Sequence, residues 1–250
     1  MGTYPRFAIY YAPAHGSALD RFGAHMLGYD ARSGEDLPFP DGIAPDWRDL
    51  TADPRKYGFH ATLKAPFYLA RGKTEADLIS ACSSFADTAR AIPLIKPVIG
   101  SISGFIAIVR AQPSGELEQL AADCVFEFDP FRAPLTAEDR TRRNPARLTP
   151  RQCEYLDRWG YPYVMEEFSF HMTLTARLKA EQREPIVAML RQHFSEIGLE
   201  TLAIDRIALF RQNDADSRFG IIGEWQLRSR TQTAVESERP MAARRRSGIP

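Results

Sequence analysis

Short apolar runs alternate with helical patterns along the chain, and together they predict strands that are separated by helices. Residues 7–13, FAIYYAP, form a β-rich run that a proline ends. Ser17 is a good N-cap for a helix that runs to about Leu27, and Gly28 can end that helix. Residues 30–55 are rich in Pro, Gly and Asp, so we expect a loop there.

The rest of the chain continues this alternation. Further strands are predicted at residues 57–70, 93–102, 104–111, 168–178, 200–212 and 219–228, and further helices at 74–91, 117–128, 149–160 and 181–197. The strands at 93–102 and 104–111 meet near Ser103 and Gly104, which is a hairpin signal. Residues 231–250 are polar, and we expect them to form a disordered tail.

An internal repeat organises the chain. Residues 59–65 and residues 170–176 both read F-H-x-T-L-x-A, and each copy is followed by a predicted helix and then by two predicted strands. The repeat predicts an α+β fold with two pseudo-symmetric lobes around a central cleft. Each lobe is expected to be an antiparallel sheet with helices on its outer face. We expect residues 1–230 to form this single two-lobed domain.

Strand alternation decides which side chains of the two motifs meet. The polar faces carry the histidines and the residues that follow them at every second position: His60, Thr62 and Lys64 in the first copy, and His171, Thr173, Thr175 and Arg177 in the second. If the two lobes face each other, the cleft contains two imidazoles and two hydroxyls in a symmetric set. Lys64 and Arg177 are then expected to add positive charge at its rim.

This set suits the hydrolysis of phosphate esters. Histidine titrates near neutral pH, so one imidazole can take a proton from water while the other gives one to the leaving oxygen. Each threonine hydroxyl can donate a hydrogen bond to a non-bridging phosphate oxygen. A lone histidine on a strand is more often structural, but two matching copies favour the catalytic interpretation. The motifs come with no H-x-H, H-E-x-x-H or carboxylate cluster, so we expect neither a metal nor a cofactor.

The charge balance narrows the range of ligands. Lysine plus arginine and aspartate plus glutamate each total 32, so no global field would attract nucleic acid or an anionic membrane. No apolar run approaches the roughly 20 residues that span a bilayer, and the first residues do not resemble a signal peptide. Cys82, Cys124 and Cys153 accompany no histidine motif, so we expect buried thiols in a reducing, cytoplasmic setting.

Residues 132–151 depart from this balance, because they hold six arginines and only two acidic residues. The segment is either a solvated face or a clamp for a second phosphate on the substrate. If it is a clamp, Arg132, Arg142 and Arg143 are the best candidates. Tyr10 falls on the polar side of the first predicted strand, from which it could stack on a ribose or a base.

The paired H-x-T-L strands resemble the two-histidine (2H) phosphoesterase superfamily, whose members include RNA 2′,3′-cyclic phosphodiesterases and tRNA-ligase-like proteins. The resemblance covers residues 5–228 and implies the two-lobed fold of that superfamily, with catalytic roles for both histidines and both threonines. The runs FAIYYAP, PRKYGFHATLKAPF, FDPFRAPLT and WGYPYV with FSFHMTLT look like a bacterial branch that is associated with phosphonate metabolism. One step there opens a five-membered cyclic phosphate on 5-phosphoribose.

Three functions remain open from the sequence. The resemblance favours a metal-independent cyclic phosphodiesterase that acts on a small ribosyl cyclic phosphate, 5-phosphoribosyl 1,2-cyclic phosphate, in phosphonate degradation. The second is an RNA or nucleotide 2′,3′-cyclic phosphodiesterase, which ranks lower because the RNA-processing branches usually lack the arginine-rich segment. The third is a non-catalytic nucleotide-binding protein. The expected partner is thus a small phosphorylated sugar or nucleotide, and no membrane is expected.

Overall fold

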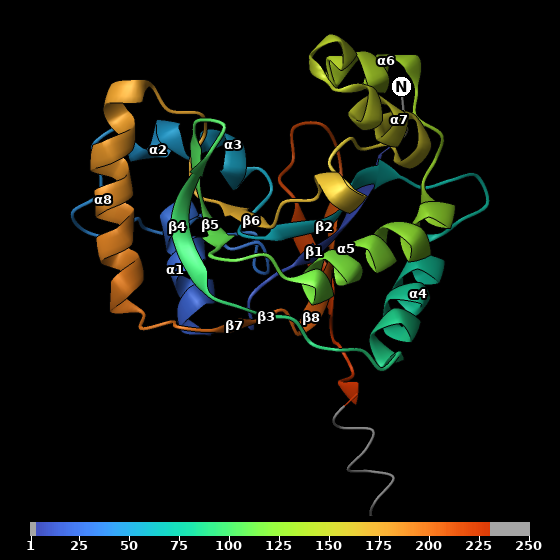
Figure 1. The fold of residues 1–250 in the computed structure, drawn as a ribbon, viewed down its shortest axis with the longest axis horizontal. Helices are drawn as coiled ribbons and strands as arrows, with labels where there is room; N and C mark the ends of the chain where they lie inside the picture. Colours follow the sequence, from blue (N-terminus) through green and yellow to red (C-terminus); the bar gives the residue numbers. More distant parts are fainter. Residues whose placement is uncertain (1–3, 231–250) are drawn as a thin grey trace, which may run out of the picture.

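Seven strands form one antiparallel sheet in the computed structural model, which describes residues 4–230 (Figure 1). The sheet order is β4-β5-β6-β2-β1-β8-β9. Its strands are β1 (Arg6–Tyr11), β2 (Ala61–Tyr68), β4 (Pro97–Ile102), β5 (Phe105–Arg110), β6 (His171–Thr173), β8 (Arg206–Gln212) and β9 (Gly220–Gln226). Two short strands, β3 (Leu94–Ile95) and β7 (Leu202–Ala203), pair separately. The predicted α+β class with an antiparallel sheet is confirmed.

Most predicted helices begin and end where their caps indicate. The longer helices are α1 (Ala18–Leu27), α4 (Glu75–Asp87), α5 (Gly115–Phe128), α7 (Pro150–Trp159) and α8 (Ala180–Glu196). Ser17 accepts a hydrogen bond from the Asp20 amide at the start of α1, and Gly28 ends the helix in the left-handed conformation. Thr74 and Thr149 form capping boxes at the starts of α4 and α7.

Two segments differ from the sequence predictions. The expected loop at 30–55 contains two short helices, α2 (Trp47–Leu50) and α3 (Ala52–Arg55), which bury Trp47. The strand expected at 168–178 is only three residues long, because the Leu174 and Thr175 amides both donate to the Ile106 carbonyl and interrupt the ladder. The arginine-rich segment contains α6 (Ala137–Arg142), which lies with α7 on one side of the molecule (Figure 1).

The two halves of the sheet exchange hairpins, which the repeat does not predict. The hairpin β4–β5 follows the first motif but pairs with β6 of the second, while β8–β9 follows the second motif and extends the sheet beyond β1. The helices follow the same exchange, since α4 contacts β8 and β9 and α8 contacts β4. Both edges of β2 are already paired, with β1 and β6, so no edge remains for the hairpin that follows it. The two halves therefore share one sheet instead of forming two separate ones.

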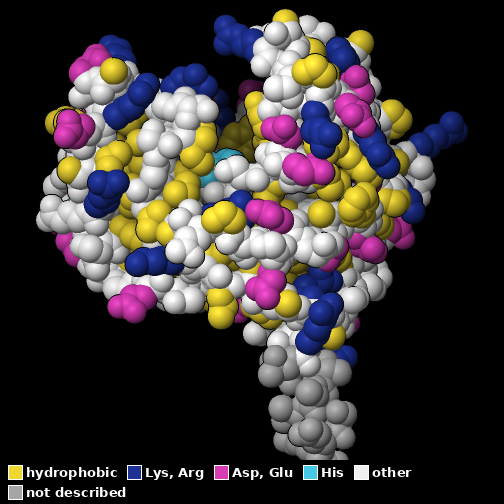
Figure 2. Space-filling model, in the orientation of Figure 1, with side chains coloured by type: hydrophobic (Ala, Val, Ile, Leu, Met, Phe, Trp, Pro, Cys, Tyr) yellow, Lys and Arg dark blue, Asp and Glu magenta, His cyan; other side chains and the backbone are white. Residues whose placement is uncertain are grey.

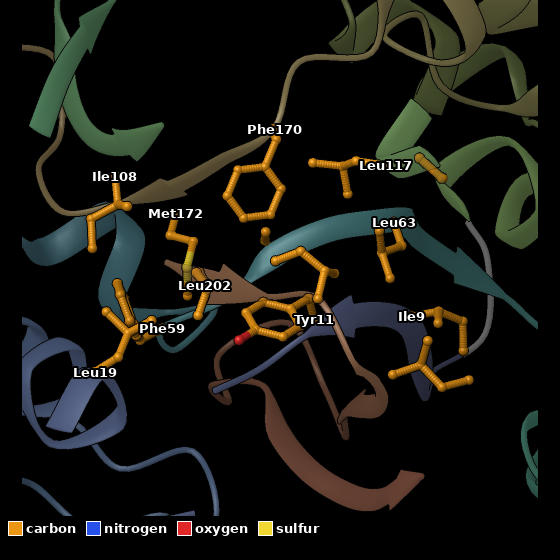
Figure 3. Packing of buried hydrophobic residues seen from close by; sticks show 14 of the residues in the cluster. Ile9, Tyr11, Leu19, Phe59, Leu63, Ile108, Leu117, Phe170, Met172 and Leu202 are labelled. Atoms are coloured by element: carbon orange, nitrogen blue, oxygen red, sulfur yellow. The ribbon is translucent and has the colours of Figure 1, made fainter. Parts of the chain in front are cut away.

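Alternate side chains of the central strands point into the main hydrophobic core. Ile9 of β1, Leu63 of β2 and Phe170, just before β6, belong to this core (Figure 3). The opposite face of the same strands carries both motif histidines. The core thus fixes which face of each motif is polar. Within residues 4–230, no helix is long and apolar enough to cross a membrane.

Gly23 of α1 lies directly against the ring of Phe59, the residue before His60, and a Cβ at that position would overlap the ring. We predict that Gly23→Ala lowers the free energy of unfolding by about 1–3 kcal/mol, the usual cost of overpacking, and also lowers activity by displacing Phe59. Urea unfolding measures the first effect. Gly115→Ala is the control, because nothing lies within 4 Å of a Cβ there. Equal stability of Gly23→Ala and the wild type would contradict the prediction.

Candidate active site

The two motifs lie side by side at the centre of the sheet. Strands β2 and β6 are antiparallel and pair through Ala61 and Met172, whose side chains are buried in the core. In an antiparallel pair the flanking residues lie opposite each other and point to the other face. His60 is therefore next to Thr173, and Thr62 is next to His171. All four predicted catalytic side chains thus share one face of two neighbouring strands.

This face looks into a hollow between the two halves of the molecule. Figure 2 shows the hollow, with histidine at its floor and basic side chains along its rim. A cavity of about 360 Å³ adjoins the motif residues Thr62 and His171. Its other walls are mainly apolar and aromatic, and include Phe105, Val125, Tyr161, Tyr163, Val164 and Phe168. A second, more open cavity reaches His171 and Thr173 from the side of Tyr57.

Both imidazoles are held in the same way. Nδ1 of His60 lies 2.9 Å from the Gly58 carbonyl oxygen, and Nδ1 of His171 lies 2.7 Å from that of Ser169. A carbonyl only accepts, so Nδ1 carries the proton of each neutral ring and Nε2 is left free to exchange a proton. In His60, Nε2 lies 3.4 Å from the Thr62 hydroxyl. The first H-x-T motif therefore presents a basic nitrogen beside a hydroxyl.

The two histidines differ in their surroundings. The ring of Tyr10 stacks on that of His60, with centroids 3.7 Å apart, whereas the ring that lies near His171 is that of Phe105, which is tilted and 5.6 Å away. Burial lowers the pKa of His60 to about 4, and the nearby imidazole of His171 contributes to the decrease. Burial also lowers the pKa of His171. The repeat is thus symmetric in sequence but not in electrostatics.

Tyr10 lies on the His60 side of the sheet, as the alternation predicts, but it does not offer a free face to a ligand. Its side chain is buried, and the stacked His60 ring and Phe210 cover it. Tyr10 also pairs with Thr62 across β1 and β2. The structure therefore places Tyr10 against the ring of His60 and leaves it no open face for the predicted stacking on a ribose or base.

Lys64 is not at the rim of the cleft. Its side chain is 3% exposed and lies under α5, where its ammonium donates to Asp129 Oδ1 at 2.7 Å and to the Val125 carbonyl at 3.0 Å. Burial lowers the pKa of Lys64 to about 8 although Asp129 opposes the decrease. The alternation does not extend as far as Lys64, because the register of β1 with β2 shifts between the Tyr10–Thr62 and Ile9–Lys64 pairs. Lys64 therefore lies opposite Ile9, a core residue, where α5 covers it. Lys64 thus anchors α5 to β2.

Two further predicted ligands have structural partners. Arg132 donates to Asp129 Oδ1 at 2.8 Å and to the Arg158 carbonyl at 3.0 Å, which joins the start of the arginine-rich segment to the end of α7. Thr175 is buried, and its hydroxyl accepts a hydrogen bond from the Ile106 amide at 3.0 Å. Both side chains are thus held by contacts within the protein.

The remaining candidates lie around the cleft. Arg177 is exposed and lines both cavities that reach His171, so the structure agrees with its predicted place at the rim. Arg142 and Arg143 line a separate pocket, together with Arg6 and Tyr57, which the sequence analysis missed. The alternation that places Tyr10 on the polar face of the first strand places Arg6 there too, so the sequence could have indicated Arg6 as a residue of the cleft. Among residues 4–230, no three His, Cys, Asp or Glu side chains gather as metal ligands do.

Comparison with known proteins shows the family. A family described as "Protein of unknown function (DUF1045)" matches residues 62–220, more than half of the chain. The chain belongs to this family. Its paired H-x-T-L strands share one sheet with both histidines on one face.

Two curated relatives carry the name ribose 1,5-bisphosphate phosphokinase PhnN. The protein of Janthinobacterium sp. (strain Marseille) is 36% identical over 228 residues, which cover 88% of this chain. The protein of Laribacter hongkongensis (strain HLHK9) is 32% identical over 215 residues, or 86% of this chain. In both cases the match covers 50% of the relative. The chain thus spans about half the length of the curated relatives it matches.

Several solved structures are more distantly similar. E. coli LigT with NADP⁺ is 15% identical, with a TM-score of 0.41 over 91% of this chain and 100% of the LigT chain. E. coli LigT with 3′-AMP is also 15% identical, with a TM-score of 0.36 over 90% and 99% of the two chains.

The low pKa of His60 predicts a pH-dependent contribution to stability. Because the folded state favours the neutral ring, this contribution is complete above about pH 6.5 and is lost as pH falls toward 4. The loss lowers the free energy of unfolding by at most about 3 kcal/mol. Urea unfolding of wild type and His60→Gln between pH 7 and 4 tests this, and the wild type should lose more stability on acidification. NMR titration should place the pKa of His60 below that of His171. A His60 pKa near 6.5 would contradict the prediction.

Proposed function

We propose that the protein is a metal-independent cyclic phosphodiesterase that opens 5-phosphoribosyl 1,2-cyclic phosphate. One observation carries the proposal: two H-x-T motifs on neighbouring strands turn both histidines and both threonines toward one cleft, and both rings have Nδ1 tied to a carbonyl. A phosphodiester needs a proton acceptor for water, a proton donor for the leaving oxygen and donors for the non-bridging oxygens. These four side chains supply each of them.

The unequal surroundings of the histidines favour distinct roles. His60, with a pKa of about 4, is neutral near pH 7 and is suited to accept the proton of the attacking water through Nε2. His171 is less covered, and the negative charge of a bound phosphodiester would raise its pKa, which favours its acting as the acid. Water oxygen then bonds to phosphorus as one ribosyl oxygen leaves and takes a proton from His171. Thr62 and Thr173 hold the non-bridging oxygens.

The name of the two curated relatives supports the choice of substrate. In 5-phosphoribosyl 1,2-cyclic phosphate one phosphate bridges O1 and O2 of the sugar. Breaking the bond to O2 leaves that phosphate on O1 and yields ribose 1,5-bisphosphate, which is the compound named in these relatives. The product of the proposed reaction is thus the substrate that their name gives, and the resemblance to the phosphonate-associated branch agrees with it. We infer that O2 is the leaving oxygen.

A nucleotide 2′,3′-cyclic phosphate is the second candidate substrate. The cavity of about 360 Å³ beside His171 has aromatic walls, including Tyr161 and Phe168, and such a cavity suits a nucleobase. The two substrates are separated by their kcat/KM values on the same purified protein. ³¹P NMR of the products shows which ester bond breaks. A protein that binds either compound without turnover would instead be the non-catalytic nucleotide-binding protein.

His60→Ala and His171→Ala should each lower kcat by about 10²–10⁴-fold, the usual effect of removing a positioned acid or base. The double variant should be hardly worse than either single one, because the two histidines act as a unit. Thr62→Val and Thr173→Val should lose less, since each removes one hydrogen-bond donor and keeps the proton-transfer pair. Steady-state assays of the folded variants measure these effects. Near-full activity in either histidine variant would refute the assignment.

The pH dependence of kcat/KM should be bell-shaped with its maximum on the acid side of pH 6.5. His60 must be neutral, which places the acidic limb near pH 4, and His171 must be protonated, so its lowered pKa brings the alkaline limb below its ordinary position. Both limbs of the profile thus lie at lower pH than they would for imidazoles with an ordinary pKa. His171→Ala should abolish the alkaline limb. The assay is run in EDTA, and restoration of lost activity only by Mn²⁺ or Zn²⁺ would contradict the metal-independent mechanism.

A further inference from the structure

A second pocket, separate from the cavity beside His171, lies between the central sheet and the arginine-rich segment. Its volume is about 230 Å³. Its walls come from β1, from the end of β2, from Tyr57 before His60, and from residues 132–143 of the segment. Four of the lining side chains are arginines: Arg6, Arg132, Arg142 and Arg143. Asp139 is the one acidic residue among those that line it.

The four arginines are not equivalent. Arg132 pairs with Asp129, and Arg142 pairs with Asp139, so carboxylates already offset their charges. Arg6 and Arg143 make no ion pair among residues 4–230. Arg6 donates to the side-chain oxygen of Gln212, a neutral group, and Arg143 lies over the ring of Tyr161 at 5.0 Å from its centroid. The pocket therefore holds two guanidinium charges without a carboxylate partner.

The pocket adjoins the catalytic face. Tyr57 forms part of its wall and also lines the cavity that contains His171 and Thr173, and the Tyr57 ring lies 6.3 Å from that of His60. The charges of Arg6 and Arg143 also act on Tyr10, which stacks on His60. Both lower the pKa of its phenol, although the stronger effect of burial raises it. A small ligand at the histidines can thus extend toward the two arginines.

We propose that this pocket binds a second phosphate group of the substrate and that Arg6 and Arg143 are its principal ligands. The inference rests on the proposed phosphodiesterase reaction, in which the cyclic phosphate lies at the two histidines. A guanidinium matches a phosphate in charge and can give it two parallel hydrogen bonds. The bound class is a ribosyl cyclic phosphate that carries a phosphomonoester at its 5-position. The sequence singled out three arginines as ligands for a second phosphate. Of these, Arg143 is a principal ligand in this proposal, and Arg6 is the other.

Kinetics with a matched pair of substrates test the pocket: 5-phosphoribosyl 1,2-cyclic phosphate and ribosyl 1,2-cyclic phosphate, which lacks the second phosphate. Arg143→Ala and Arg6→Ala should each lower kcat/KM for the phosphorylated substrate by roughly 10–150-fold, the usual worth of a charge-assisted contact. Both should leave the unphosphorylated substrate nearly unaffected. Arg143→Lys keeps the charge but not the paired geometry, so its loss should be smaller than that of Arg143→Ala.

Arg140→Ala is the matched control. Arg140 lies in α6, the helix that Arg143 follows as its C-cap, but it pairs with Asp157 of α7 and does not line the pocket. The Arg140→Ala variant loses the same charge, and its kcat/KM should change by the same factor for the two substrates. If Arg140→Ala discriminates between the substrates as strongly as Arg143→Ala does, the effect comes from the general charge of the segment and the pocket assignment is wrong. Thermal unfolding confirms that each variant is folded, and Arg143→Ala decides the test if Arg6→Ala does not fold.

Calorimetric binding of ribose 5-phosphate separates this inference from the proposed reaction, because that compound has no cyclic ester. It should bind the wild type, and bind Arg143→Ala and Arg6→Ala more weakly by a similar factor. If the wild type cleaves neither cyclic phosphate but this binding still depends on the two arginines, the reaction is wrong and the phosphate pocket stands. If cyclic phosphates are cleaved and the arginine variants treat both substrates alike, the pocket is wrong and the reaction stands.

Discussion

The pairing of β2 with β6 is the constraint on which the site depends. The two strands meet at the Ala61–Met172 pair, and their remaining partners lie on the outer sides, β1 for β2 and β5 for β6. Side chains alternate along a strand, so a slip of one residue on either strand would turn its histidine and threonine into the core. Leu63, Phe170 and Met172 oppose such a slip because they are buried on the other face. The register of the hydrophobic core thus also sets the register of the histidine and threonine side chains of the two motifs.

A symmetric sequence motif becomes an asymmetric pair of groups through what covers each copy. Tyr10 comes from β1 and closes over the ring of His60, while the corresponding neighbour of β6 is β5, from which only Phe105 approaches His171. Desolvation acts more strongly on the covered ring and favours its neutral form. General acid–base catalysis needs one proton acceptor and one donor, so this inequality is useful to the proposed reaction. The pseudo-symmetry supplies the geometry, and the different residues that β1 and β5 place against the two rings break it.

Local signals predicted local structure well. Ser17, Thr74 and Thr149 marked helix starts that the structure confirms, and Ser103 with Gly104, both at positive φ, form the predicted hairpin turn. The alternation in the two motifs gave the correct polar face. It could not show where Lys64 lies, because a register shift between β1 and β2 interrupts the alternation before Lys64, and Val125 and Asp129 contact Lys64 from more than sixty residues away. The hairpin exchange was hidden for the same reason, since the repeat describes order along the chain and not which edge of a strand is free.

The charge balance of the whole chain conceals a local separation of charge. Equal numbers of acidic and basic residues argue against a ligand that is held by a long-range field, such as a nucleic acid. They do not argue against a small anion, because the local pairing of charges decides that. Asp129 and Asp139 offset Lys64, Arg132 and Arg142, whereas Arg6, Arg143 and Arg177 have no carboxylate partner among residues 4–230 and lie around the hollow. A site of this kind favours a compact ligand whose phosphates are close together over a long polyanion.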